Sequence, residues 1–167
     1  LALDQIDFQI DTGETLAVIG GTGAGKSTLA NLLVRMYDVT DGSVAVNGID
    51  IRDVRQRDLR HKIGFAPQDA VLFSGTIRDN LTYGKPDATD ADIWEALEIA
   101  QGANFVRELE AGLDSKVEHG GGNFSGGQRQ RLSIARALVT DADILVFDDS
   151  FSALDFKTDA NLRAALK

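Results

Sequence analysis

Apolar and polar positions along the first half of the chain predict strands before and after one helix. Alternation over residues 6–10 and an unbroken apolar run over residues 16–19 each predict a strand, and the second of these is expected to be buried. A glycine-rich loop then leads to a helix beginning at Lys26, because apolar residues recur there at three- and four-residue spacing. A short strand over residues 44–46 follows and ends at the turn dipeptide Asn47-Gly48.

The second half begins with a strand, becomes helical, and ends with another strand and a helix. Residues 63–66 predict a strand that Pro67 stops. An apolar run over residues 144–147 predicts a second buried strand, and the last helix begins near Asp155. Between the two strands, helices are expected over residues 76–81, 90–100, 105–109 and about 128–138, with a glycine cluster at residues 120–122.

This order of elements predicts the fold class and the domain organisation. Strands that alternate with helices indicate an α/β sheet, here with a β-rich N-terminal part, and the purely helical middle indicates a smaller subdomain inserted into it. We expect a single domain over residues 1–167. Its α/β core takes about residues 1–68 and 140–167, and its helical subdomain takes about residues 69–139.

The composition, 43% apolar and 26% charged over 167 residues, is typical of a folded soluble domain. No apolar run approaches the roughly 18 residues that a membrane-spanning helix needs. The chain has no cysteine, which excludes a disulfide framework and a thiolate metal site and is compatible with a reducing compartment. A net charge of −9 argues against broad binding to nucleic acid, because phosphate contacts need clustered Lys and Arg. We therefore expect no nucleic-acid partner.

The glycine-rich loop before the first helix fits the motif G-x-x-x-x-G-K-[ST] of P-loop NTPases. Its glycines let backbone N–H groups point at phosphate oxygens, and the following helix presents about half a positive charge at its N-terminus. Lys26 adds a full charge for the β and γ phosphates, and the Ser27 hydroxyl suits Mg²⁺. An ordinary glycine turn would have no use for this lysine and hydroxyl. The residues predicted to bind ATP or GTP are Gly20, Gly21, Thr22, Gly23, Ala24, Gly25, Lys26, Ser27 and Thr28.

Two aspartates follow the predicted strand over residues 144–147. Ligands bind at the carboxyl ends of strands in α/β sheets, so this position suits a carboxylate that holds the Mg²⁺ of a bound nucleotide. We assign Asp148 to the metal. Asp149 beside it is the candidate general base that polarises the attacking water. Either aspartate could instead only cap the following turn.

A second glycine-rich segment lies before the predicted long helix. A serine hydroxyl and two glycine N–H groups ahead of a helix N-terminus suit a γ-phosphate. The segment resembles the signature of ABC transporter ATPases, whose usual form has Leu where Phe124 stands. The residues assigned to nucleotide binding on this basis are Ser125, Gly126, Gly127 and Gln128.

Further motifs of the same family follow in order, so the resemblance covers nearly the whole chain. Gln68 is similar to the Q-loop glutamine and Ser152 to Asp155 are similar to the D-loop. The resemblance gives Gln68 a catalytic and a metal-binding role, although a polar turn residue after Pro67 is the plain alternative. Residues 72–81 resemble a segment of exporter-type members, whose ATPase domains are fused or attached to membrane domains, and this favours export over import.

The resemblance also implies a mechanism and partners. In this family two ATPase domains sandwich two ATP molecules head to tail, so that the phosphate loop of one domain faces the signature of the other. ATP closes the dimer, hydrolysis reopens it, and the Q-loop region passes the motion to membrane helices. We therefore expect ATPase activity coupled to transport, with ATP and Mg²⁺ as cofactors. The expected partners are a second ABC ATPase domain and the coupling helices of a transmembrane domain, at the cytoplasmic face of the cell membrane.

Some positions depart from the pattern of the family. The residue after the metal-binding aspartate is usually Glu, whereas Asp149 is one methylene shorter. A carboxylate drawn back by about an ångström costs on the order of a hundredfold in rate. This change resembles the degenerate site of heterodimeric exporters and predicts a non-identical partner subunit. Glu118 to Gly121 also differ from the Gly-Glu-Arg-Gly-like run of many exporters, so the coupling contact made there is not predicted.

The family's adenine-stacking aromatic and switch histidine fall upstream of Leu1 and beyond Lys167. Neither His61, among basic residues, nor His119, in the glycine-rich loop, replaces that histidine. We expect the chain to be part of a longer polypeptide and to be inactive by itself. Two alternatives stay open: a soluble ABC ATPase acting in translation or DNA repair, and a nucleotide-gated module that scarcely hydrolyses ATP. The transported substrate is not predicted.

Overall fold

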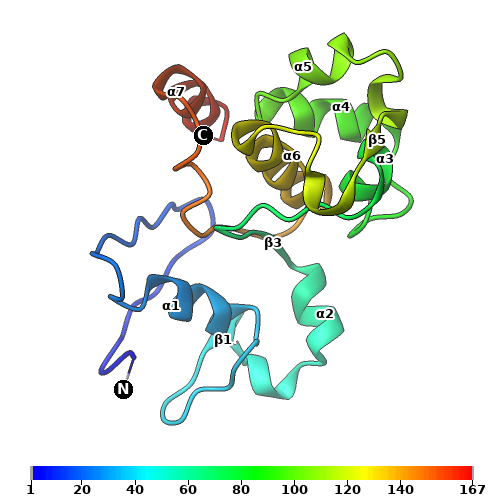
Figure 1. Cartoon of the computed structure of the whole chain (residues 1–167). Coiled ribbons are helices and arrows are strands. Elements are labelled where there is room, and N and C mark those ends of the chain that lie inside the picture. The colour runs from blue at the N-terminus through cyan, green and yellow to red at the C-terminus, as the bar shows by residue number, and fades with distance from the viewer. Residues whose placement is uncertain (1, 167) are drawn as a thin grey trace. The chain divides into compact units, whose positions relative to one another are not determined.

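The computed structural model of the chain describes residues 2–166 (Figure 1). These residues form two compact units, one extending to Arg60 and the other starting at His61. The first unit holds the glycine-rich loop and the helix after it. The second holds the paired strands, the helical cluster and the signature segment.

The first unit is built around one helix and one hairpin. The Asn47-Gly48 dipeptide has φ values of 52° and 77°, which are the left-handed conformations that a two-residue type I′ hairpin turn requires. The turn at these two residues was expected from the sequence and the structure confirms it, whereas the second strand of the hairpin was not predicted. The elements of this unit are α1 (Lys26–Leu33), β1 (Ala45–Val46), β2 (Ile49–Asp50), the 3-10 turn η1 (Ile51–Asp53) and α2 (Gln56–His61).

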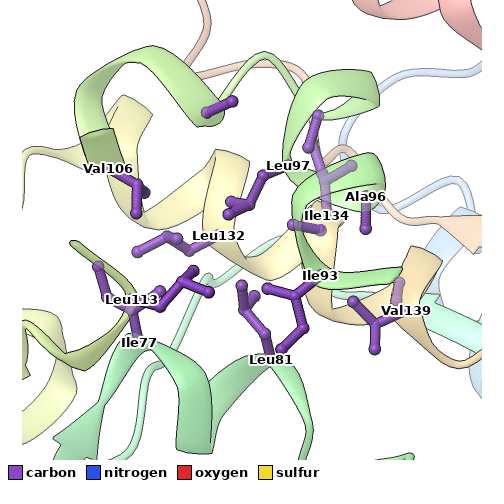
Figure 2. Close-up of a cluster of buried hydrophobic side chains, with 14 of the residues drawn as sticks. Ile77, Leu81, Ile93, Ala96, Leu97, Val106, Leu113, Leu132, Ile134 and Val139 are labelled. Atoms are coloured by element: carbon purple, nitrogen blue, oxygen red, sulfur yellow. The ribbon is translucent and has the colours of Figure 1, made fainter. Parts of the chain in front are cut away.

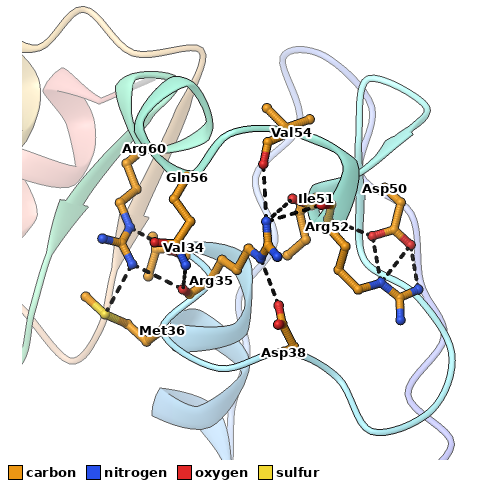
Figure 3. A network of polar contacts seen from close by, with 10 residues as sticks. All are labelled: Val34, Arg35, Met36, Asp38, Asp50, Ile51, Arg52, Val54, Gln56 and Arg60. Atoms are coloured by element: carbon orange, nitrogen blue, oxygen red, sulfur yellow. Dashed lines mark hydrogen bonds and ion pairs between the residues drawn. The ribbon is translucent and has the colours of Figure 1, made fainter.

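Arginine side chains connect the end of α1 to the segment that follows the hairpin (Figure 3). Arg35 donates to the carbonyl oxygens of Ile51, at 3.1 Å, and of Val54, at 3.2 Å. Arg60 donates to the carbonyl oxygen of Val34 at 3.0 Å. Carbonyls at a helix end lack helical partners, so a guanidinium that binds them stabilises the end of α1.

Arg52 stabilises the same region by pairing with Asp50. The two side chains form an ion pair of 2.6 Å, and this bonding lowers the pKa of the Asp50 carboxyl to about 2. Asp50 also accepts the backbone N–H of Arg52 at 2.9 Å, which caps η1.

The predictions of strands over residues 6–10 and 16–19 are wrong for this structure. Residues 6–10 and 14–20 have no strand pairing, and Leu16 and Ile19 are 47% and 93% exposed. A strand is defined by hydrogen bonds to a neighbouring strand, and within residues 2–60 the only ladder is the β1–β2 hairpin. The apolar pattern therefore predicted a capacity for burial, not the presence of a pairing partner.

The second unit combines a parallel strand pair with a cluster of helices. Its strands are β3 (Ile63–Ala66), β4 (Gly75–Thr76), β5 (Lys116–Val117) and β6 (Ile144–Phe147). Its α-helices are α3 (Ile77–Leu81), α4 (Asp90–Ile99), α5 (Ala103–Glu108), α6 (Gly126–Val139) and α7 (Phe156–Ala165), and its 3-10 turns are η2 (Gly112–Asp114) and η3 (His119–Gly121).

Three helices in this unit begin with a capping box. Thr76, Thr89 and Ser125 each accept a backbone N–H at position N3, and the N3 side chain bonds back to the cap residue. These reciprocal caps fix the starts of α3, α4 and α6. Asp155 caps α7 by accepting the N–H of Thr158 at 3.0 Å.

The core of the second unit lies between α4 and α6 and is closed by α3 and α5 (Figure 2). Ile93 and Leu97 of α4 are 0% exposed and lie one helical turn apart. Leu132 and Ile134 of α6 are 1% and 0% exposed. Trp94 is only partly buried and packs against this cluster.

The mixed strands and helices agree with the α/β fold class expected from the sequence. Within the second unit β3 and β6 run parallel, with Ala66 opposite Phe147, so both strands end at the same edge. Leu145 of β6 is nevertheless 40% exposed, which is more than a fully buried strand predicts.

Replacing Leu97 with Ala should remove about 3 kcal/mol from the free energy of unfolding, because the core closes only partly around the cavity. The measurement is urea unfolding followed by the fluorescence of Trp94, the only tryptophan of the chain. Glu95→Ala, at an exposed position of the same helix, is the matched control and should change stability by less than about 0.5 kcal/mol. Equal effects of the two substitutions would contradict the described core.

Candidate nucleotide-binding sites

Glycines shape the loop that leads into α1. Gly23 and Gly25 have φ values of 80° and 90°, and Gly25 is the residue directly before the helix. A Cβ on Gly25 would lie 2.7 Å from a methyl carbon of Leu3 and 2.9 Å from the carbonyl oxygen of Ala2. Both conformation and space thus exclude a side chain at Gly25, whereas Gly21 has nothing within 4 Å of a Cβ.

The side chain of Lys26 folds back over this loop. Its ammonium group donates to the carbonyl oxygens of Gly20, at 2.7 Å, and Gly21, at 3.0 Å. Ser27 follows in the first turn of α1, where the helix dipole favours negative charge. The loop thus gathers backbone N–H groups, a cation and a hydroxyl at one helix N-terminus, which is the arrangement that binds a nucleotide phosphate.

Parallel pairing of β3 with β6 brings three predicted site residues of the second unit to one edge. Asp148 continues β6, and its N–H donates to the carbonyl oxygen of Ala66 at 3.0 Å. Gln68 lies two residues beyond β3, and its amide donates to the Asp149 carboxylate at 3.5 Å. The following turn is bonded to the backbone carbonyl of Asp149, which accepts the Ser152 hydroxyl at 3.0 Å. The carboxylate of Asp149 therefore has a bond outside that turn.

The donor atoms predicted for a metal suit Mg²⁺. Ser27, Gln68 and Asp148 offer a hydroxyl, an amide oxygen and a carboxylate, all hard oxygen ligands. Gln68 uses its nitrogen in the bond to Asp149, so that bond leaves its oxygen for a cation or its water shell. Gln68 and Asp148 lie at one strand edge, whereas Ser27 belongs to the other unit.

The signature segment forms the capped start of α6. The Ser125 hydroxyl accepts the N–H of Gln128 at 3.2 Å, and the Gln128 side chain accepts the N–H of Ser125 at 2.9 Å. A hydroxyl has one donor and two acceptor positions, so this cap leaves the hydroxyl proton for an outside oxygen. Gly126 and Gly127 are the first two residues of the helix, where N–H groups have no helical partner. The structure thus brings the four predicted residues together.

Two contacts, one at the signature and one at the strand ends, were not predicted from the sequence. A Cβ on Gly127 would lie 3.2 Å from the carbonyl oxygen of Ala153, so the residues resembling the D-loop pack closely on the helix start. Ser150 is fully buried, and its hydroxyl donates to the carbonyl oxygen of Ala66 at 2.6 Å, which joins the ends of β3 and β6. Neither contact has a sequence signal, because each joins residues far apart in the chain.

The two histidines lie where the sequence suggested. His61 is the exposed last residue of α2, and His119 is exposed in η3. The segment around His119 is ordered by Asn123, whose side chain accepts the N–H of Glu118 at 3.0 Å and donates to the carbonyl of Lys116 at 2.8 Å.

A phosphate loop on a helix start, a strand-end aspartate and an α/β fold together define the class of P-loop nucleotide-binding domains. The chain matches the ABC transporter family over residues 3–152, and it belongs to that family. Among residues 2–166, no helix combines the length and apolar character needed to cross a membrane.

Relatives of the chain include ATP-binding proteins and exporters. An uncharacterized ABC transporter ATP-binding protein of Mycobacterium tuberculosis is 51% identical over 168 residues, covering 99% of this chain and 28% of the relative. An ATP-dependent lipid A-core flippase of Desulfotalea psychrophila is 44% identical over 165 residues, with 99% and 29% covered. The chain thus spans less than a third of these relatives.

A solved structure has a similar fold. It is that of a bacterial Atm1-family ABC exporter with ATP bound, and its sequence is 42% identical to this chain. The superposition covers 87% of this chain and 26% of the exporter chain, with a TM-score of 0.83.

Gly25→Ala should weaken ATP binding by tenfold or more, because a side chain at φ of 90° and in contact with Leu3 strains the loop by about 1–3 kcal/mol. Titration with a fluorescent ATP analogue measures the affinity. Gly21→Ala is the matched control and should keep the affinity within about twofold, since a Cβ there meets nothing. Equal losses in both variants would refute the described loop geometry.

Bonds from the side chain and the backbone of Thr158 lower the pKa of Asp155 below its ordinary value. A lowered pKa in the folded state gives stability that is present above the unfolded pKa of about 4 and is lost as pH falls through the folded value. Asp155→Asn keeps a capping oxygen but has no charge to titrate. The difference in melting temperature between wild type and Asp155→Asn should therefore be largest near pH 7 and shrink below about pH 4, as thermal unfolding would show. A difference independent of pH would contradict this role.

Proposed function

We propose that this chain is the ATP-binding domain of an ABC exporter, which binds Mg·ATP and drives transport by closing on a second ATPase domain and reopening after hydrolysis. The observation that carries the proposal is the presence of two anion-binding helix starts in one chain. The start of α1 has the lysine and the glycines of a phosphate loop, and the start of α6 has the Ser125 hydroxyl with two glycines. The similarity to a flippase and to an exporter with ATP bound supports export.

The two helix starts are proposed to serve different ATP molecules. The family resemblance implies a head-to-tail pair of domains in which Lys26 and Ser27 bind one ATP while Ser125 binds the γ-phosphate of the other. The Ser125 cap supports this role, because its proton is left for an oxygen outside the chain's own helix. Gln68 and Asp148 would hold Mg²⁺ and its water shell, as a strand-end carboxylate does in P-loop NTPases.

We further propose that the site containing Lys26 hydrolyses ATP slowly. The Asp149 carboxylate is shorter than the usual Glu, and it accepts a bond from Gln68 at 3.5 Å. Asp149 also has a φ of 49°, a left-handed conformation that Asp tolerates better than most residues. The partner domain is then non-identical, and its own phosphate loop, completed by Ser125 of this chain, would be the faster site.

The remaining assignments are part of the same proposal. The partner regions are a second ABC ATPase domain and the coupling helices of a transmembrane domain, which places the chain at the cytoplasmic face of the cell membrane. The helical subdomain over about residues 69–139 would carry the signature, and the core over about residues 1–68 and 140–167 would carry the phosphate loop and the acidic strand end.

Asp149→Glu, made in the full-length assembled protein, should raise the turnover of the slow site by on the order of tenfold to a hundredfold, because the added methylene moves the carboxylate about an ångström closer to the attacking water. Steady-state release of phosphate from ATP measures it. Asp143→Glu, an exposed acid at the other end of β6, is the matched control and should have no effect.

An unchanged rate in Asp149→Glu would refute the slow-site proposal. Asp149 also favours a second function for this chain's own site, a nucleotide-gated module that holds ATP and scarcely turns it over. Single-turnover measurement with the partner present separates the two. ATP retained over many turnovers of the partner site would support the gated module.

A further inference from the structure

The α4–α5 turn lies close to the signature segment and presents an ordered carbonyl to it. Gln101 has a φ of 58°, Gly102 N–H donates to the carbonyl of Leu97 at 2.7 Å, and Gln101 N–H donates to the carbonyl of Glu98 at 3.0 Å. This pair of bonds is a Schellman motif, which ends α4 with a residue in the left-handed conformation. The turn leaves the carbonyl of Gln101 to accept a bond from outside the helix.

Arg131 of α6 makes that bond and a second one within the signature. Its guanidinium donates to the carbonyl of Gln101 at 2.9 Å and to the carbonyl of Gly127 at 3.2 Å. The same group lies over the ring of Phe105 of α5, at 4.9 Å from the ring centroid. One planar side chain therefore joins the α4–α5 turn, α5 and the first turn of α6.

A second connection reaches the signature through Phe124. Phe105 contacts Phe124, the residue before Ser125, with ring centroids 6.3 Å apart in an edge-to-face arrangement. Both rings are buried, at 9% and 6% exposure. The ring of Phe105 thus lies between the guanidinium of Arg131 and the residue that precedes the signature serine.

We propose that Arg131 is a positioning residue that holds the signature segment from Phe124 to Gly127 in the orientation needed to bind the γ-phosphate of a partner's ATP. The effect of Arg131 on catalysis rests on the proposed function, whereas its effect on the order of the signature rests on the contacts described above. A planar guanidinium can bond two carbonyls and stack on a ring at once, whereas a lysine ammonium is a single point charge. Signature residues displaced by about an ångström would lose much of their effect on the transition state.

Partial burial supports the strength of these bonds. Desolvation lowers the pKa of Arg131 from its ordinary value, while the charge of Asp155 opposes that change. An arginine remains charged at every relevant pH, so its bonds to the two carbonyls keep a full positive charge in a partly desolvated place.

Arg107 provides a matched control in the same unit. Its guanidinium lies 4.9 Å from the ring centroid of Trp94 and pairs with Glu98 at 2.6 Å. Its distance to an aromatic ring thus equals that of Arg131, but it pairs with α4 and not with the signature. A lysine at either position removes the planar guanidinium that stacks on a ring. At position 131 the substitution also removes a bond to the signature, whereas at position 107 it does not.

The first arm of the test is hydrogen exchange in the nucleotide-free full-length protein. Arg131→Lys should raise the exchange rate of the backbone N–H groups over residues 126–129 by on the order of tenfold, with the amides of α4 unchanged. Arg107→Lys should leave residues 126–129 at the wild-type rate. Unchanged exchange in Arg131→Lys, or an equal rise in Arg107→Lys, would overturn the positioning role. A rise spread over α4 as well would show general loss of stability and would also overturn it.

The second arm is the ATPase kinetics of the assembled protein. Arg131→Lys should lower kcat/KM for ATP by about tenfold, mainly through a lower kcat, because the loss falls on the transition state, whereas Arg107→Lys should change it less than twofold. Wild-type kinetics in Arg131→Lys would overturn the catalytic consequence. If the wild-type assembly hydrolyses no ATP, the proposed function fails, and hydrogen exchange still decides whether Arg131 orders the signature.

Discussion

The parallel pairing of β3 with β6 is the interaction on which the acidic part of the site depends. Because Ala66 lies opposite Phe147, the residues after both strands leave the pair at the same edge. Gln68 and the two aspartates meet there without any further constraint, and the buried Ser150 hydroxyl joins the two strand ends through the carbonyl of Ala66. The carboxylate proposed to hold Mg²⁺ and the candidate base are thus positioned by backbone hydrogen bonds between the two strands.

Helix α6 packs against β3 and has two roles. Its buried face, with Leu132 and Ile134, forms the core with α4, and its first turn presents Ser125 and the glycines. Because the buried face of α6 is packed rigidly, the first turn of the helix is restricted as well. This packing lets a segment with two glycines hold a fixed orientation. Arg131 lies between these two parts of the helix and bonds to the turn that ends α4.

Local chemistry in the sequence predicted most of the second unit and the loop of the first. Caps, helical spacing and apolar runs each involve residues that are close in sequence. They therefore predicted the helix start at Thr76, the helix over residues 90–99 and the strands over residues 63–66 and 144–147. The strand predicted over residues 16–19 is absent, because pairing depends on a distant neighbour that the local pattern does not specify. The contacts of Gly127 with Ala153 and of Arg131 with Gln101 depend on the tertiary arrangement and carry no local signal.

The phosphate loop and the signature of this chain are proposed to serve two different ATP sites. The site that contains Lys26 would hydrolyse ATP slowly, and the site completed by Ser125 would hydrolyse it fast. The most direct measurement compares steady-state ATP hydrolysis by the full-length assembly carrying Lys26→Ala or Ser125→Asp in this chain alone. Asp keeps the helix cap but repels a γ-phosphate, so the fold at α6 is preserved. Ser125→Asp should remove nearly all hydrolysis, whereas Lys26→Ala should leave most of it. Equal losses in the two variants would contradict this assignment of the two sites.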